Sequence, residues 1–144
     1  MAESVDTTQL LSTYVPMDRR HALAAGTTLP AETRGTALFA DISGFTPLAE
    51  ALAQALGPRR GAEELLRTLN SICDALVGAV HRYRGSVIGF AGDAVTCWFD
   101  ETPGGASCAA PAALRAATCA TEMQQAMEQF SDTPSPIALK VAMA

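Results

Sequence analysis

Two apolar runs separated by three residues most constrain the fold of this chain. Residues 86–90 and 94–99 are rich in apolar, β-branched and aromatic side chains, and the turn-forming sequence Ala91-Gly92-Asp93 lies between them. This pattern predicts a β-hairpin. Because the two strands of a hairpin run antiparallel, the sheet that contains them is not all-parallel. The rest of the chain must therefore complete a sheet with antiparallel pairs.

Apolar periodicity predicts the remaining elements. In chain order these are a buried strand at 36–42, helices at 46–56 and 63–84, a helix at 112–130 and a last strand at 137–143. The helix at 112–130 is alanine-rich, and its expected inward positions are Leu114, Thr118, Met123, Met127 and Phe130. The order β-α-α-β-β-α-β indicates an α+β, ferredoxin-like fold with the helices packed on one face of the sheet.

A chain of 144 residues is long enough for one domain with one hydrophobic core. We expect this domain at residues 35–144, preceded at 1–34 by an N-terminal arm that packs on the domain or on a partner. The last predicted strand stops one residue before the end of the sequence, so we expect the domain to be truncated at its C-terminus. Four cysteines form no C-x-x-C pair and are expected to be small, buried hydrophobic residues: Cys73, Cys97, Cys108 and Cys119.

The charge and hydropathy of the chain argue against some functions. The formal net charge is −5 and Lys140 is the single lysine, so a basic surface for nucleic acid is not expected. No apolar run reaches the roughly 18 residues that a membrane span needs. The N-terminus lacks the basic and apolar regions of a secretory signal. We therefore expect a cytoplasmic protein without nucleic-acid or membrane partners.

Two carboxylates stand at the ends of predicted strands. Asp41 ends the buried strand, and Asp93 lies at the tip of the hairpin. We expect the first strand and the hairpin to be neighbours, so the two side chains would meet at one edge of the sheet. Adjacent carboxylates repel each other unless a cation lies between them, and Mg²⁺ is a hard cation that prefers oxygen ligands. The residues alone leave two alternatives open: Asp41 as a carboxylate at a helix entry, and Asp93 as an ordinary turn residue.

The turn after the first strand has the features of a phosphate site. It consists of Ser43, Gly44, Phe45 and Thr46, and we expect Thr46 to cap the following helix. The free N–H groups and the positive dipole end of a helix N-terminus suit a triphosphate. Gly44 has no side chain, so it would let a phosphate approach the backbone closely.

Two segments resemble the metal motifs of one enzyme family. Phe39-Ala40-Asp41-Ile42-Ser43-Gly44-Phe45-Thr46 closely resembles the F-x-D-I-x-G-F-T segment of class III adenylate and guanylate cyclases. Gly89-Phe90-Ala91-Gly92-Asp93-Ala94 is similar to their second metal motif, most of all that of the soluble, bicarbonate-responsive type. The resemblance runs from about Thr36 to the C-terminus and implies the N-terminal part of a class III nucleotidyl cyclase fold.

The resemblance implies a role for each matching residue. Asp41 and Asp93 would be the catalytic carboxylates that ligate two Mg²⁺ ions, with Mn²⁺ as an alternative, and Ile42 would add its backbone carbonyl. Ser43, Gly44, Phe45 and Thr46 would hold the nucleotide phosphates. The implied reaction converts ATP to cyclic AMP and pyrophosphate for intracellular signal transduction. This makes the protein a phosphorus–oxygen lyase, either an adenylate or a guanylate cyclase.

Two departures from the family pattern concern the other half of the site. The purine-selecting lysine of the family lies four residues before the second metal aspartate, where this chain has Gly89, so the choice of ATP over GTP stays open. The transition-state Asn and Arg of the family lie on a later helix, beyond the last predicted strand. The resemblance therefore implies a dimeric site, in which a tandem domain or second subunit supplies the Lys, Asn and Arg.

Two other functions stand beside the cyclase interpretation. Gly89 and the missing later helix motivate a non-catalytic, cyclase-like module that binds nucleotide or a partner domain and regulates it. A diguanylate cyclase shares the two-metal logic, but the chain lacks the G-G-[DE]-E-F hairpin of that class. Magnesium-dependent ATP binding without a cyclic product, in the presence of a competent partner, would favour the regulatory module.

Overall fold

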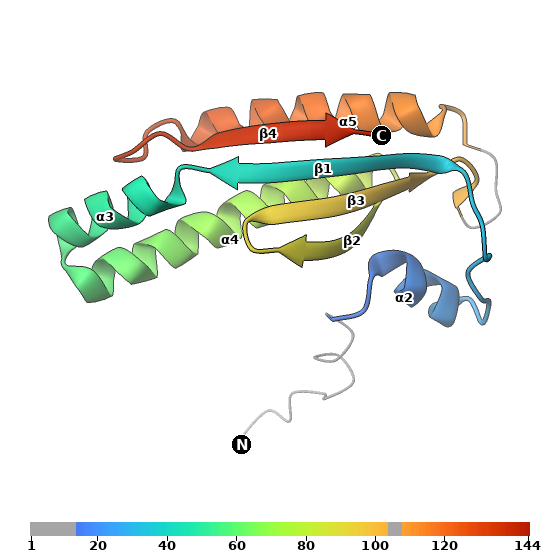
Figure 1. The fold of residues 1–144 in the computed structure, drawn as a ribbon, viewed down its shortest axis with the longest axis horizontal. Helices are drawn as coiled ribbons and strands as arrows, with labels where there is room; N and C mark the ends of the chain where they lie inside the picture. The colour runs from blue at the N-terminus through green and yellow to red at the C-terminus, as the bar shows by residue number, and fades with distance from the viewer. Residues whose placement is uncertain (1–13, 104–107) are drawn as a thin grey trace, which may run out of the picture.

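The computed structural model describes residues 14–103 and 108–144 as an α+β domain (Figure 1). Residues 1–13 of the predicted N-terminal arm lie outside the described residues. The elements in chain order are α2 (Met17–Ala24), β1 (Gly35–Ser43), α3 (Phe45–Leu56), α4 (Pro58–Arg82), β2 (Ser86–Ala91), β3 (Ala94–Asp100), α5 (Ala112–Met127), the short 3₁₀ helix η2 (Glu128–Phe130) and β4 (Ala138–Met143). The predicted order β-α-α-β-β-α-β from residue 35 onward is confirmed.

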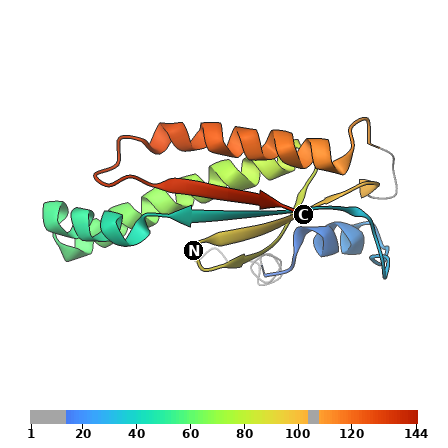
Figure 2. The same cartoon turned by 45° about the horizontal axis from the view of Figure 1, so that its top comes forward.

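The four strands form one antiparallel sheet in the order β2-β3-β1-β4. β1 is therefore an inner strand that pairs with the hairpin strand β3 on one side and with β4 on the other. Helices α4 and α5 cover one face of this sheet, and α3 extends from the end of β1 (Figure 2). Among the described residues, no helix combines the length and the hydrophobicity of a membrane span.

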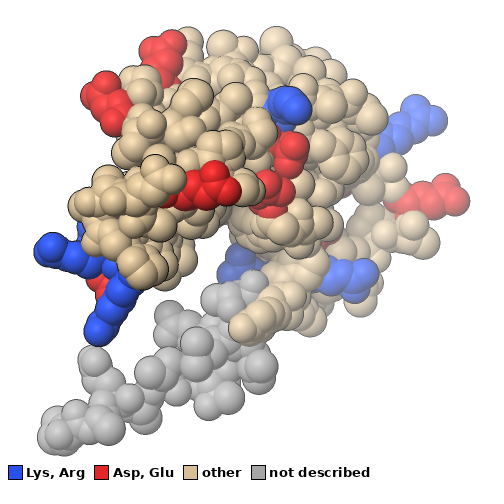
Figure 3. Space-filling view, turned by 60° about the vertical axis from the view of Figure 1, so that its left-hand side comes forward, with Lys and Arg blue, Asp and Glu red and all other residues tan. Residues whose placement is uncertain are grey.

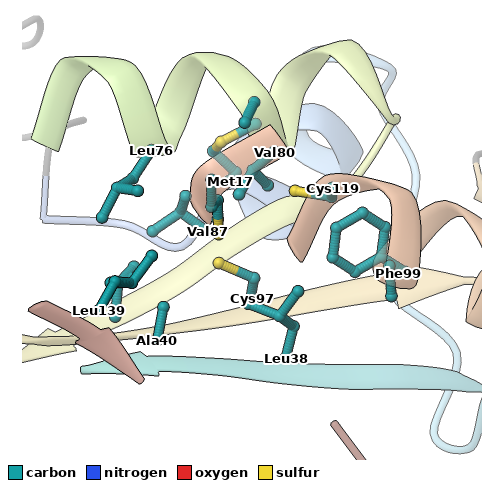
Figure 4. Close-up of a cluster of buried hydrophobic side chains, with 14 of the residues drawn as sticks. Met17, Leu38, Ala40, Leu76, Val80, Val87, Cys97, Phe99, Cys119 and Leu139 are labelled. Atoms are coloured by element: carbon teal, nitrogen blue, oxygen red, sulfur yellow. The ribbon is translucent and has the colours of Figure 1, made fainter. Parts of the chain in front are cut away.

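Successive residues of strand β1 lie alternately on the two faces of the sheet. Leu38, Ala40 and Ile42 are buried under the helices, whereas Phe39 and Asp41 between them are exposed on the opposite face. This alternation follows from the period of two in a β-strand. The same alternation in β3 buries Val95, Cys97 and Phe99, which pack with residues of α4 and α5 (Figure 4).

The first half of helix α5 turns a different face to the core than its sequence suggests. The prediction is right for Met123 and in part for Met127 and Phe130, which are half-buried against the core, but Leu114 is 57% exposed and Thr118 is exposed too. The buried positions are instead small or polar: Ala112, Arg115, Ala116 and Cys119, with Met123. Small side chains let the helix lie close to the sheet, and this close approach outweighs the burial of one leucine.

The cysteines partly match their prediction. Cys97 and Cys119 are buried, Cys73 and Cys108 are half-buried, and all four are free thiols. Burial raises the pKa of Cys97 and of Cys119 to about 12, so both thiols stay protonated at neutral pH. These two cysteines act as small hydrophobic residues of the core.

Candidate active site

The structure brings the two predicted carboxylates to the same end of the sheet. Asp41 pairs with Ala94 across the β1–β3 ladder, so Asp93 is the residue next to its partner. The backbone N–H of Ile42 donates a hydrogen bond to the carbonyl of Asp93 at 3.1 Å. Both side chains are exposed. Figure 3 turns this end of the molecule toward the viewer, and acidic and basic side chains lie close together near the middle of that face.

Local backbone geometry explains the position of each carboxylate. The alternation of β1 places Asp41 on the face that the helices leave uncovered. Asp93 follows Gly92, which has a φ of +63° in the two-residue turn between Ala91 and Ala94. A positive φ at the first central position suits glycine and fits the twist of an antiparallel hairpin. The chain therefore reverses direction at Gly92 and Asp93, beside the end of β1.

The predicted phosphate turn lies directly after Asp41 and leads into α3. The expected cap at Thr46 is wrong, because α3 begins at Phe45 and its N-cap is Gly44. Gly44 has a φ of +101°, and a Cβ there would lie 2.4 Å from the carbonyl oxygen of Pro136. Only glycine meets both conditions without strain. The Ser43 hydroxyl donates to the carbonyl of Ala138 at 3.4 Å, which connects the turn to β4.

The start of α3 has the properties of an anion site. The first N–H groups of a helix have no acceptor within the helix, and the helix dipole adds partial positive charge there. Phe45 and Thr46 contribute such groups, and Leu48 already donates to the carbonyl of Gly44 at 3.2 Å. The turn from Ser43 to Thr46 thus begins two residues after Asp41, at the end of the sheet where Asp93 also lies.

Lys140 is a further candidate residue, which the sequence alone did not indicate. In the β1–β4 ladder it pairs directly with Asp41, and both side chains are exposed. Directly opposite residues of an antiparallel pair lie on the same face, so the only lysine of the chain stands next to the candidate carboxylate. The strand at 137–143 was predicted from its apolar sequence, but the register between β1 and β4 was not.

The donor atoms at this end of the sheet fit magnesium. Asp41 and Asp93 offer carboxylate oxygens, and Ile42 between them offers a backbone carbonyl oxygen. Hard oxygen donors from one or two carboxylates are the usual protein contribution to a Mg²⁺ site that also binds phosphates. Among the residues that the structure describes, no group of three or more His, Cys, Asp or Glu side chains forms a metal-ligand cluster. The fit therefore depends on the pair Asp41 and Asp93.

The position of Gly89 is open. Gly89 lies in β2, is exposed, and a Cβ placed there would meet nothing within 4 Å. A β-bulge separates its pairing from that of Val87. Sterics therefore do not require glycine at this position, and the chain presents no side chain to a ligand there.

One hollow lies beside the candidate site, and a second lies away from it. A small, mainly apolar recess of about 40 Å³ lies under the hairpin, and its walls include Ile42, Val77 and Asp93. A groove of about 480 Å³ lies elsewhere, between α3, α4 and the segment after α5. The groove is larger, but the exposed carboxylate pair and the phosphate turn better mark the site of chemistry. The groove is lined by Leu48, Leu52, Leu56, Glu64, Arg67, Thr68, Ser71, Gln129, Phe130, Asp132, Thr133 and Pro134.

Comparison with curated proteins finds relatives of one kind. A stretch of 61 residues is 43% identical to adenylate cyclase type 10 of rat, mouse and human. This stretch is 42% of the chain and 4% of each relative, so the chain matches only a small part of these proteins. No protein-family model matches the chain.

Comparison with solved structures finds the same fold in three further proteins. The crystal structure of the guanylyl cyclase Cya2 is 25% identical, with a TM-score of 0.55 over 81% of this chain and 57% of that one. The adenylyl cyclase CyaB from P. aeruginosa is 24% identical, with a TM-score of 0.59 over 75% and 53%. A bacterial light-regulated adenylyl cyclase is 19% identical, with a TM-score of 0.63 over 95% and 40%. The sheet and helices described above are thus the fold of these cyclases.

Proposed function

Because this chain is related to adenylate cyclase type 10 and has the fold of a class III nucleotidyl cyclase catalytic domain, we propose that it forms the metal-binding half of a cyclase site. The observation that carries the proposal is the juxtaposition of Asp41 and Asp93, linked by the hydrogen bond from Ile42 to Asp93. The substrate is ATP, with GTP as the alternative, and the products are the cyclic nucleotide and pyrophosphate. The protein acts in the cytoplasm in intracellular signalling.

The residues at this end of the sheet have different roles in binding the metal ions and the nucleotide. Asp41, Asp93 and the carbonyl of Ile42 would hold two Mg²⁺ ions, or Mn²⁺ in their place. Bound there, the metal would supply positive charge that favours ionisation of the ribose hydroxyl and neutralises the triphosphate. Both carboxylates are exposed, so a nucleotide can reach them without a rearrangement of the core.

The phosphate turn and Lys140 orient the triphosphate. N–H groups at the start of α3 donate to phosphate oxygens, while the absence of a side chain at Gly44 makes room for the Pro136 carbonyl behind the turn. Lys140 stands across from Asp41 on the same face and adds a positive charge beside the phosphates. Together, these groups hold the leaving pyrophosphate next to the carboxylates, where its developing charge is stabilised.

A complementary domain completes the site. Phe39 is 46% exposed and Phe90 is 59% exposed, on the sheet face that α4 and α5 leave uncovered and at the hairpin beside it. Aromatic side chains are enriched at protein interfaces, and we assign these two to the contact with the partner. The partner, a tandem domain or a second subunit, supplies the purine-selecting Lys and the transition-state Asn and Arg, and Gly89 leaves space for the base.

Cyclase assays with matched variants test the proposal. The chain is mixed with a domain that carries the missing Lys, Asn and Arg, and cyclic AMP and cyclic GMP are measured with Mg·ATP and Mg·GTP. We expect Asp41→Asn and Asp93→Asn each to reduce turnover by roughly 100-fold or more, because each removes a negative charge from the metal site. Asp74→Asn, an exposed aspartate on α4, is the control and should keep full activity. Full activity of either site variant, with the fold intact, would refute the proposal.

The open position at Gly89 favours one other function. Without a side chain there to meet a base, the chain could act as a non-catalytic, cyclase-like module that binds nucleotide and regulates a partner. Binding of Mg·ATP with no cyclic product in the mixture would favour this function over catalysis. The same Asp41→Asn and Asp93→Asn variants would then weaken nucleotide binding while no turnover is seen in any form.

A further inference from the structure

The segment before β1 holds the hairpin edge of the sheet at two places. We define the strap as residues 14–34, which include α2 and the chain that leads into β1. β2 is the edge strand of the sheet, and α2 packs against it. Figures 1 and 2 both show α2 on the β2 side of the sheet, far from β4.

The first hold is Met17. It is 7% exposed and belongs to the same core as Val80 and Val87, which flank it in Figure 4. Its Sδ lies 2.9 Å from Nε2 of His81, near the end of α4. Met17 therefore fills the gap between the end of α4 and the start of β2, and it is the buried residue of α2.

The second hold lies at the other end of the strap. The Thr33 hydroxyl donates to Oδ2 of Asp100 at 2.7 Å, and the N–H of Glu101 donates to the carbonyl of Arg34 at 2.9 Å. Both bonds connect the strap to the end of β3. The strap is thus attached to both strands of the hairpin, at β2 through Met17 and at β3 through Thr33 and Arg34.

These holds are weak compared with the rest of the core. Half of the residues of α2 are exposed, and Leu23 among them is 72% exposed. The Nε of Arg20 is buried without a hydrogen-bond partner among the described residues, which costs free energy that a released strap would recover. A segment with one buried side chain and an unsatisfied donor belongs to the low-stability part of a fold.

We propose that the strap is a releasable clamp on the hairpin that carries Asp93. In the closed state it completes the core at β2 and shields this edge strand, whose outer backbone groups would otherwise pair with another chain. In the released state β2 loses its packing at Val87, and the hairpin turn at Gly92 and Asp93 becomes less ordered. The carboxylate at the hairpin tip is thereby coupled to the segment that precedes the sheet, whatever reaction the site performs.

Amide hydrogen exchange on the full chain tests the clamp. In Met17→Ala we expect exchange at residues 86–95 to rise at least tenfold, while β1, β4 and α5 keep their protection. Sedimentation should show more self-association through the uncovered edge. The matched control is Leu23→Ala, which removes an exposed apolar side chain from the same helix and should change neither readout.

A second variant separates release of the strap from general loss of stability. Thr33→Val removes the hydroxyl at the other end without removing any core atom, and it should also raise exchange at 86–95 selectively. A uniform rise across all elements in both variants would show that Met17 and Thr33 only add to global stability, and would overturn the proposal. Unchanged exchange at 86–95 would overturn it equally. Neither readout requires cyclase activity, so the result is independent of the proposed function.

Discussion

Gly44 is the residue whose backbone most restricts substitution at the candidate site. Its φ of +101° disfavours any side chain, and a Cβ at this position would lie only 2.4 Å from the Pro136 oxygen. Gly57, which caps the next helix, also has a positive φ of +82°, but a Cβ there would meet nothing within 4 Å. A comparison of the same substitution at the two glycines therefore distinguishes the cost of backbone strain from the cost of steric overlap.

We predict that Gly44→Ala destabilises the fold more than Gly57→Ala. Backbone strain at a positive φ costs roughly 1–3 kcal/mol in either variant. Gly44→Ala adds the displacement of the Pro136 segment, which also moves the phosphate turn. Urea unfolding measures both free energies, and equal losses in the two variants would show that the close approach to Pro136 contributes nothing.

Lys140 gives a second prediction at the scale of the residue. If its charge binds phosphate, Lys140→Met should raise KM for Mg·ATP by about tenfold, which corresponds to about 1.4 kcal/mol of lost binding. Lys140→Arg keeps the positive charge and should retain most of the affinity. Steady-state kinetics in the presence of the complementary domain measure both values. A KM that is unchanged in Lys140→Met would place the lysine outside the phosphate site.

At the scale of the elements, the stability that Asp100 contributes at the junction of the strap with β3 depends on pH in a defined direction. Burial opposes ionisation of Asp100, but hydrogen bonds from Thr33, Thr102 and Trp98 outweigh it and lower the pKa of this carboxyl below its usual 3.8. A carboxyl whose pKa is lower in the folded state stabilises the fold above its unfolded pKa. This stability is lost as the pH falls below about 3.8 and through the lower folded value.

Thr33→Val should therefore flatten the acid limb of the stability curve. The variant loses one of the hydrogen bonds that lower the Asp100 pKa, so less stability remains to be lost below the usual pKa of this carboxyl. Unfolding by urea at pH values from 6 down to about 3 measures the effect. Thr102→Val, which removes another hydroxyl near Asp100, is the comparison. A stability curve identical to that of the parent chain in both variants would contradict this account of Asp100.

The elements of the sheet were predictable because their patterns are local. The apolar runs and the glycine turn predicted β1 and the hairpin to within one or two residues, and the long periodicity of α4 was visible in the sequence. The alanine-rich α5 was less predictable, since many faces of such a helix are apolar. Arg115 illustrates this: it is buried, and its guanidinium donates to the carbonyls of Tyr83, Arg84, Ala110 and Asp100. The periodicity of apolar residues cannot reveal a core position that is occupied by an arginine.

The residues of the candidate site were likewise predictable only in part. Asp41, Asp93 and the turn after β1 stand out because each lies close to a glycine at the end of a predicted strand. Lys140 does not, because its place depends on the pairing of β1 with β4, which are far apart in the sequence. The start of α3 was misplaced for a third reason. Thr46 and Pro47 form a good capping sequence, but the first helical hydrogen bond runs from Leu48 to the carbonyl of Gly44, so the helix begins at Phe45.

For the whole molecule, the uncovered face of the sheet predicts how the two halves of the site associate. Phe39→Ser should lower the free energy of unfolding by only about 1–2 kcal/mol, because the side chain is already half exposed. It should nevertheless weaken association with the complementary domain and lower partner-dependent turnover. Leu114→Ser, at an exposed apolar residue of α5, a helix that covers the other face of the sheet, is the matched control. Equal effects of both variants on association, measured by titration calorimetry, would rule out this face as the interface.

The hydrogen bond between Ile42 and Asp93 also has a consequence for folding kinetics. It closes a long loop that contains α3, α4 and β2, and the entropy of closing such a loop must be overcome before the contact forms. The β2–β3 hairpin is local and can form early, but the two carboxylates become neighbours only when β1 docks onto β3. Affinity for a divalent cation would then appear late in refolding, after most of the helical signal. A stopped-flow experiment with a metal-sensitive probe would time the completion of the central ladder.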